Sequence, residues 1–297
     1  MIQAKYSNKR EVLTKTQENK SSQKEFWINE FAEEFKILEL PADFARPPIK
    51  GYESNSVKFE LSEEETKSLK SLASEAGSSM FMVLLAVYNI LVSKLSNQED
   101  IVVGTPISGY QYADLKIMIG MVENTIPIRN YPKGELSFSD FLSVLTTRTL
   151  ACFDNQAFRY EDLVYELNID LDPSRNPLID VMFSYLKFEK PELKIPGLTL
   201  HLCDEGHGIT QYDLTLLARE TDEKLYLIYE YSSELFKEET IERFVSYFKE
   251  IISTVISKPN TKISKIEIIT NKEKDLILPD LVRRQDTDKH ERQENIQ

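Results

Sequence analysis

Histidine is the side chain that most often acts as a general acid or base near neutral pH, and the 297-residue sequence contains only three. His290 lies in a charged C-terminal segment, and His201 lies in a stretch that alternates like a strand. His207 stands between two glycines, shortly before Tyr212 and Asp213, so we expect a flexible loop that could bring its imidazole to a cleft. A catalytic base needs an orienting partner, which the sequence does not identify, so an ordinary loop histidine is the alternative.

Two further polar residues interrupt apolar stretches. Asp213 lies within the apolar run 212–216, and burial of a carboxylate is costly unless a cation pairs with it. We expect either a structural ion pair, with Arg175 or Arg129 as partner, or a carboxylate that faces a channel. Asn124, at the entry of an expected strand, leaves a similar choice between satisfying backbone groups and contacting a ligand.

Several common catalytic patterns are absent from the sequence, namely the phosphate loop, GxGxxG, GxSxG and HExxH. The two cysteines, Cys152 and Cys203, form no CxxC pair, although His201 and His207 flank Cys203. Core packing in a reducing compartment is favoured over a metal or redox role, so we expect no metal site.

Composition narrows the possible partners. A formal net charge of −13 argues against a nucleic-acid partner, because backbone phosphates bind basic surfaces. The longest apolar run, 80–92, is shorter than the roughly 18–20 residues of a membrane span. The first 22 residues hold no apolar core of a secretory signal. We therefore expect a cytoplasmic protein without a membrane partner.

The apolar periodicity predicts alternating helices and strands. Ser62 and Glu65 form a capping box that opens a helix ending near Gly77, and the next helix, 79–95, is apolar nearly all round and must be buried. Other helices are expected at 25–40, 137–153, 160–167 and 239–257. Strands are expected at 56–61, 101–104, 122–129, 178–188, 212–219 and 225–231, the last two as a hairpin. This order predicts an α/β fold, a two-layer α+β sandwich with helices packed on a mixed sheet.

The most distinctive stretch runs from Leu171 to Phe183. Pro173 and Pro177 fix a turn, and the residues from 178 to 188 are apolar so continuously that we expect a strand covered on both faces. For the domain organisation we expect a polar arm at 1–24, one lobe at 25–270 and a charged, disordered tail at 271–297.

Five segments, in this order, resemble the C-terminal half of a condensation domain of nonribosomal peptide synthetases. They are Ile101–Pro106, Ile119–Arg129, Gln156–Val164, Ser174–Phe183 and Tyr212–Thr215. The similarity covers most of the chain, from Phe26 to about Thr270. Two departures stand out: Asn155 replaces a common histidine, and Arg159 replaces a usual proline.

The resemblance implies two lobes, each like chloramphenicol acetyltransferase, with a tunnel between them. It implies acyltransferase-like, amide-forming chemistry in secondary metabolite and antibiotic biosynthesis, on substrates carried by the phosphopantetheine arms of peptidyl carrier proteins, with no cofactor bound directly. The family's catalytic motif, HHxxxDG, belongs to the N-terminal lobe, and no His-His pair occurs in this sequence. We therefore assign no catalytic residue. The substrate or tunnel candidates are Asn124, Ser184, Tyr212, Asp213 and His207.

By resemblance, residues 104–121 approach the floor of the tunnel, and the segment between 188 and 210 crosses to the other lobe. Without that lobe an apolar surface would be exposed, which predicts a partner lobe or self-association. Three interpretations remain open: an acceptor-side half that works with a separate N-terminal lobe, a non-catalytic module that binds a carrier protein or a synthetase subunit, and an inactive truncated remnant.

Overall fold

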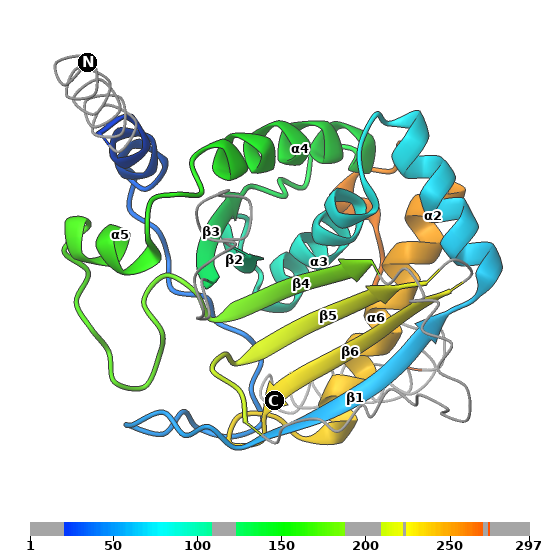
Figure 1. Ribbon diagram of the computed structural model, residues 1–297. Helices are drawn as coiled ribbons and strands as arrows, with labels where there is room; N and C mark the ends of the chain where they lie inside the picture. Colours follow the sequence, from blue (N-terminus) through cyan, green and yellow to red (C-terminus); the bar gives the residue numbers. More distant parts are fainter. Residues whose placement is uncertain (1–20, 109–122, 188–208, 222–223, 270–272, 274–297) are drawn as a thin grey trace, which may run out of the picture.

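A six-stranded sheet forms the centre of the computed structural model, which describes residues 21–108, 123–187, 209–221, 224–269 and 273. The strand order is β1-β6-β5-β4-β2-β3 (Figure 1). The strands β2 and β4 run parallel, as do β4 and β5, and the other neighbours are antiparallel. The bounds are β1 Ser54–Leu61, β2 Ile101–Ser108, β3 Glu123–Asn130, β4 Val181–Lys187, β5 Leu214–Glu220 and β6 Leu225–Ser232. The expected mixed sheet is confirmed.

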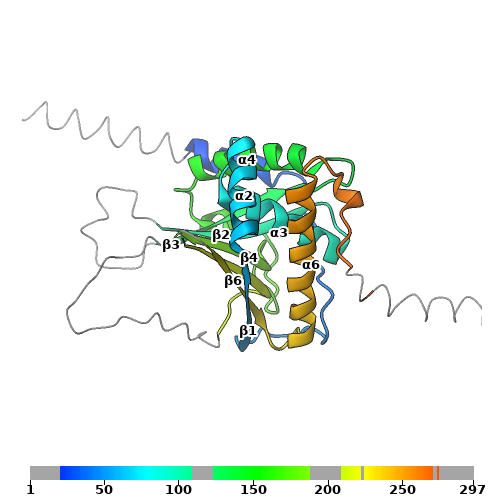
Figure 2. The ribbon, with the colours of Figure 1, turned by 90° about the vertical axis from the view of Figure 1, so that its right-hand side faces the viewer.

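The helices lie on one side of this sheet, so the fold has two layers (Figure 2). The bounds are α2 Glu63–Glu75, α3 Met80–Ser96, α4 Phe138–Asp154, α5 Tyr160–Glu166, α6 Glu238–Ser257 and the short 3₁₀ helix η3 Ile263–Lys265, and residues 21–30 are also helical. The α/β prediction is therefore confirmed, as is the β5–β6 hairpin, in which the Thr221 amide donates to the Lys224 carbonyl.

The predicted helix starts are confirmed at atomic level. The Ser62 hydroxyl accepts from the Glu65 amide, and a Glu65 carboxylate oxygen accepts from the Ser62 amide at 2.8 Å. The Ser79 and Ser137 hydroxyls likewise accept from the amides of Met82 and Asp140 at the starts of α3 and α4, without the reciprocal bond to the capping residue's amide. Gly77 follows α2 with φ of 58°, the left-handed conformation that glycine adopts without steric cost.

Helix α3 forms the middle of the core, as its uniform apolar character predicts. Every residue from Val83 to Val92 is fully buried. No single helix in the described ranges is long and apolar enough to cross a membrane; the bent pair of α2 and α3 meets that criterion jointly, with 103° between its members.

The prediction of one helix over 25–40 is wrong, because the helix ends at residue 30. The Arg129 guanidinium donates to the carbonyls of Glu33 and Glu34 at 3.0 and 3.1 Å and is paired with Asp100. These distant donors satisfy carbonyls that would otherwise accept bonds along a helix. The chain then continues as an irregular segment, which the local periodicity could not reveal.

The expected strand over 178–188 is also corrected. Strand β4 begins only at Val181, since Leu178 has φ of 62°, a conformation incompatible with a strand. Val181 and Phe183 are fully buried and Met182 is 6% exposed, whereas Leu186 is 51% exposed. The strand is thus covered on both faces at its start and on one face at its end.

Candidate functional site

The face of the sheet opposite the helices carries Ser184. Its neighbour Phe183 points toward the helices, with its ring centroid 5.2 Å from that of Phe81 and 6.2 Å from that of Tyr88 in α3. Because side chains alternate along a strand, Ser184 points to the helix-free face. It is half-buried and lies beside Leu217 of β5 in the ladder.

The floor beside Ser184 is closely packed. Gly104 of β2 is paired with Met182 of β4, and a Cβ atom at Gly104 would clash with the Met182 sulfur and lie 2.7 Å from the Ile179 Cγ2. Only glycine therefore lets the Met182 side chain lie over β2 at this point.

Tyr212 lies just before β5, at the edge of the same region. The Tyr212 ring is half-buried, with the Lys50 ammonium 5.9 Å from its centroid. Burial raises the pKa of the Tyr212 phenol, and a hydrogen bond with the Thr125 side chain opposes that rise. Burial likewise lowers the pKa of Lys50, against the attraction of nearby Asp213. A neutral phenol therefore faces a partly desolvated ammonium.

The Asn124 side chain is fully occupied by backbone groups. Its amide nitrogen donates to the carbonyls of Gln156 and Phe158, both at 2.9 Å, and its oxygen accepts from the amides of Thr125 and Tyr160 at 3.0 and 3.2 Å. Asn124 therefore holds the loop between α4 and α5 against β3, which makes it a positioning residue in this geometry.

That loop connects to the distinctive turn of the sequence. The Tyr160 hydroxyl donates to the Pro177 carbonyl, and the pKa of Tyr160 is raised by burial and by the nearby Tyr212. On the other side, the Trp27 indole donates to the Asn155 carbonyl at 2.9 Å. Thus the loop from Asn155 to Tyr160, which contains both departures from the family pattern, Asn155 and Arg159, joins the first helix to the candidate site.

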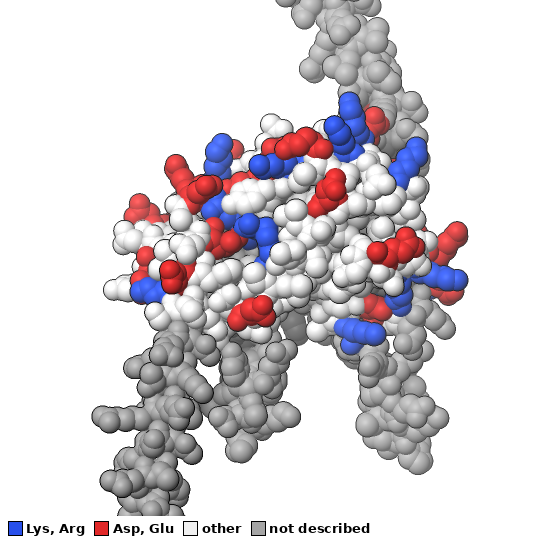
Figure 3. Space-filling view, turned by 90° about the horizontal axis from the view of Figure 1, so that it is seen from above, with Lys and Arg blue, Asp and Glu red and all other residues white. Residues whose placement is uncertain are grey.

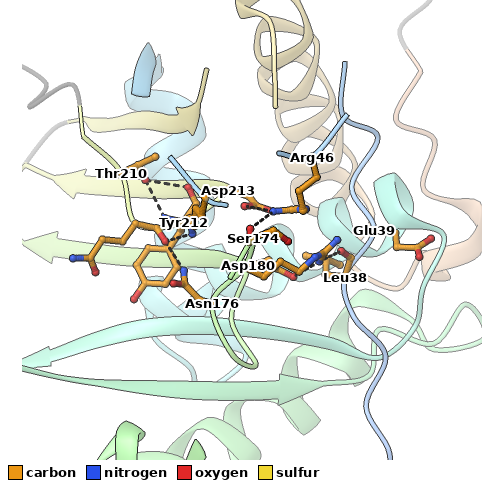
Figure 4. Close-up of polar contacts among 12 residues, drawn as sticks. Leu38, Glu39, Arg46, Ser174, Asn176, Asp180, Thr210, Tyr212 and Asp213 are labelled. Carbon is orange, nitrogen blue, oxygen red and sulfur yellow. Dashed lines mark hydrogen bonds and ion pairs between the residues drawn. The ribbon is translucent and has the colours of Figure 1, made fainter. Parts of the chain in front are cut away.

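Asp213 is buried in an ion pair with Arg46 (Figure 4). Both terminal nitrogens of the Arg46 guanidinium donate to the carboxylate, Nη1 at 3.1 Å, and Nη1 also donates to the Ser174 carbonyl at 3.2 Å. The sequence favoured Arg175 or Arg129 as partner, and that assignment is wrong. Arg129 is paired with Asp100, and Arg175 with Asp180.

Asp180 is a buried acid that sequence reasoning missed. Its Oδ2 accepts from Arg175 Nη1 at 2.8 Å, and the same nitrogen donates to the Leu38 carbonyl at 2.9 Å. Burial, together with the like charge of Asp213, raises the pKa of Asp180 to about 6. The available signal was the same as for Asp213: an acid that interrupts an apolar run, here between Ile179 and Val181.

The structure thus places Tyr212 and Asp213 just before β5, Asn124 at the start of β3 opposite the end of β2, and Ser184 further along β4. His207, His201 and Cys203 lie outside the described residues. Cys152 is buried in the core, and burial raises its pKa to about 12. Within the described ranges, no three His, Cys, Asp or Glu side chains come together as metal ligands do.

The surface above α4 gives no electrostatic indication of a charged partner. In Figure 3 the basic and acidic side chains lie interspersed around a largely uncharged centre, without an extended patch of one sign in the described part of this face. Val144 and Leu150 of α4 are about half exposed, at 50% and 52%.

Comparison with known proteins identifies the relatives of this chain. It is 38% identical to Bacitracin synthase 3 of Bacillus licheniformis over 256 residues, which are 86% of this chain and 4% of that protein. It is 39% identical to Surfactin synthase subunit 1 of Bacillus subtilis (strain 168), again over 256 residues, which cover 86% of this chain and 7% of that one. The chain therefore spans only a small part of the length of these relatives.

Solved structures share the fold. A four-domain nonribosomal peptide synthetase bound to AMP and glycine superposes with a TM-score of 0.77 at 22% identity, over 84% of this chain and 20% of that one. The X-domain from teicoplanin biosynthesis superposes with a TM-score of 0.77 at 20% identity, over 89% and 61%. The expected chloramphenicol acetyltransferase-like architecture is confirmed. A sequence model of the Condensation domain matches residues 4–278, and the chain therefore belongs to the condensation domain family of nonribosomal peptide synthetases.

Proposed function

We propose that this chain is the acceptor-side lobe of a condensation domain, which forms an amide bond between substrates held as thioesters on carrier proteins. In this reaction the acceptor amine attacks the carbonyl carbon of the donor thioester. The C–N bond forms, the C–S bond breaks, and the thiolate of the donor arm leaves and takes up the proton that the amine loses. The histidines of HHxxxDG, absent from these 297 residues, are supplied by another lobe.

The observation that carries this proposal is the family match over residues 4–278 in a sequence without any His-His pair. The geometry supports it, because Ser184 and its neighbours in β4 lie on the sheet face opposite the helices. Among the described residues, no helix packs on that face (Figure 2). Three apolar or aromatic side chains remain exposed nearby or on that face: Leu186 at 51%, Tyr226 at 43% and Ile209 at 66%. A second lobe would cover such a surface.

The test mixes the purified chain with donor-loaded and acceptor-loaded carrier proteins, with and without a separately expressed lobe that carries HHxxxDG. Mass spectrometry then detects the dipeptidyl thioester. We expect product only when both lobes are present. Product from this chain alone would refute the need for an external lobe.

A pair of variants links the reaction to the sheet face. Ser184→Phe places a bulky ring on the helix-free face and should abolish product in the two-lobe mixture. Ser246→Phe makes the same chemical change on the exposed surface of α6 and should leave product formation unchanged. Equal activity of the two variants would place the substrate path elsewhere.

The second candidate is a non-catalytic module that binds a carrier protein or a synthetase subunit. The missing His-His pair favours it over independent catalysis. Calorimetric titration with a loaded carrier protein should then give saturable heat even when no product forms in any mixture. If the titration gives no heat and no mixture gives product, the chain is an inactive remnant.

A further inference from the structure

The strands of the sheet are not all joined over the same length. Within the described residues, β2 and β4 are paired only at residues 103–104 of β2 and 181–182 of β4, although both strands continue beyond these pairs. By contrast, β4 is paired with β5 along its whole length, and β2 is paired with β3 along both strands. The boundary between β2 and β4, which we call the seam, is therefore the shortest pairing in the sheet.

A proline explains why the pairing at the seam stops. Arg148 Nε donates to the Arg129 carbonyl at 3.0 Å, so the backbone groups of Arg129 face away from β2. Because backbone groups alternate in direction along paired strands, the register between β2 and β3 turns residues 102, 104 and 106 of β2 toward β4. In a parallel ladder the amide of residue 106 would donate to the Phe183 carbonyl, but this residue is Pro106, which has no N–H.

Beyond this point both strands become accessible. Val103 and Val181 are fully buried within the paired part, whereas Pro106 and Leu186 are exposed and Ser184 is half-buried. If the register of the two pairs continued, residue 106 would lie opposite residue 184. Proline is rarely found at such a position in an interior strand. The unpaired part of the seam thus lies beside Ser184, on the face that our proposed function uses.

Two tyrosine side chains bridge the unpaired part of the seam. The Tyr160 hydroxyl donates to the Pro177 carbonyl, in the turn that leads into β4. The Tyr212 side chain, just before β5, forms a hydrogen bond with the side chain of Thr125. Thr125 is the residue of β3 that is paired with Pro106. Both bonds therefore lie close to the point at which the backbone ladder ends.

Tyr160 lies on the β3 side of the seam because Asn124 holds it there. The Asn124 side-chain oxygen accepts from the Tyr160 amide at 3.2 Å, and its nitrogen donates to the carbonyls of Gln156 and Phe158, both at 2.9 Å. The start of β3 and the loop 155–160 thus form one unit. The other unit is β4 with β5 and the turn before β4, and each tyrosine side chain is bonded across the two.

We propose that the seam is a joint that opens beside Ser184. The end of β2, the start of β3 and the loop 155–160 move together against β4 and β5 about the last paired residues, Gly104 and Met182, and the bonds of Tyr160 and Tyr212 hold the joint closed. Opening admits the thioester-bound substrate to the Ser184 face. The role as an entrance rests on the proposed function, whereas the motion does not depend on it.

Amide hydrogen exchange on the unmodified chain tests the motion directly. The amides of Gly104, Val181 and Phe183 point across the seam, and all three residues are buried. They should exchange about tenfold or more faster than the amides of Leu216 and Leu227, which are equally buried in β5 and β6, because a local opening exposes the seam alone. Equal protection of the two groups of amides would overturn the joint.

Variants that add or remove one hydrogen bond should shift this exchange in opposite directions. Pro106→Ala supplies a donor for the Phe183 carbonyl and should slow exchange of the seam amides about 2- to 10-fold. Tyr160→Phe and Tyr212→Phe each remove a bond that holds the joint closed and should speed exchange by a similar factor. Tyr247→Phe, which removes a hydrogen-bonding hydroxyl from α6, is the matched control and should leave these amides unchanged. Shifts in the same direction for Pro106→Ala and the two tyrosine variants would contradict the joint.

The rate of amide formation tests the role as an entrance. In the two-lobe mixture, Pro106→Ala should lower the initial rate of product formation by the factor by which it slows seam exchange, and Tyr247→Phe should not change it. An unchanged rate with slower seam exchange would refute the entrance. If the unmodified chain gives no product with the second lobe, the proposed function fails, and the exchange measurements still decide whether the joint opens.

Discussion

At the scale of single residues, the pairing of Asp213 with Arg46 decides what this acid does. Asp213 had two possible roles in the sequence, an ion pair or a channel-facing carboxylate, and in the structure its carboxylate is 3% exposed and bidentate with Arg46. The partner is 167 positions away, in a proline-rich connector without periodicity, so no local pattern could identify it. Asp180 carries the same local signal, an acid within an apolar run, but its partner Arg175 and its burial depend on tertiary contacts.

Removing one member of this pair should be costly. Asp213→Leu should lower the free energy of unfolding by about 3–5 kcal/mol, because the Arg46 charge is left buried without its partner. The double variant Arg46→Leu, Asp213→Leu should lose clearly less than the sum of the two single variants. Urea denaturation of all four proteins gives the coupling. Additive losses would mean that the two charges do not stabilise one another.

Asp180 should give the chain a characteristic dependence on pH. Its pKa of about 6 in the folded state lies above the value of about 3.9 in an unfolded chain, so the folded state holds the proton more tightly. The folded state therefore loses stability as pH rises through this interval. Arg175, Arg46 and Lys50 reduce the rise of this pKa, and Asp213 increases it.

The variant Asp180→Asn isolates this effect. Its unfolding free energy relative to the unmodified chain should increase by roughly 2 kcal/mol between pH 4.5 and pH 7.5, because the amide does not titrate. Denaturation across this range, with Asp154→Asn on the exposed end of α4 as control, gives the difference. A difference that stays constant with pH would show that Asp180 titrates normally.

At the scale of elements, local chemistry predicted the regular structure well. The capping serines, the buried helix α3 and the hairpin were all readable from side-chain type and period. The errors fall where distant groups act on the backbone. Arg129 binds the Glu30 carbonyl at the end of the first helix and the carbonyls of Glu33 and Glu34 just after it, and the turn that includes Leu178 delays the start of β4. For Asn124 the local pattern left two roles open, and the structure shows that its amide donates to the Gln156 and Phe158 carbonyls of another loop.

The close packing of β2 against β4 predicts that a methyl group added at Gly104 lowers the stability of the fold. Gly104→Ala should destabilise the chain by about 1–3 kcal/mol, because the added Cβ clashes with the Met182 sulfur. The double variant Gly104→Ala, Met182→Ala should destabilise by less than the sum of its parts, since the shorter side chain makes room. Thermal and urea unfolding measure both, and additive losses would contradict this packing.

At the scale of the whole molecule, the described residues form one two-layer lobe with helices on a single side of the sheet (Figure 2). Five ordered segments carried the resemblance seen in the sequence, and the family assignment depends on the match over residues 4–278 and on the relatives. The structure gives three of these segments a physical role. Asp213 forms an ion pair with Arg46, Val181 begins β4, and Asn124 holds the loop between α4 and α5. It assigns none of them the proton transfer that the HHxxxDG histidines would perform in our proposal.

The central claim is that amide formation needs this lobe together with one that carries HHxxxDG. The most direct measurement titrates that second lobe into a fixed amount of this chain, with loaded carrier proteins present, and records the initial rate of dipeptidyl thioester formation. We predict no product at zero added lobe, a rate that saturates as the two lobes associate, and no rate with Ser184→Phe. Product without the second lobe, or no product at any concentration of it, would contradict the account.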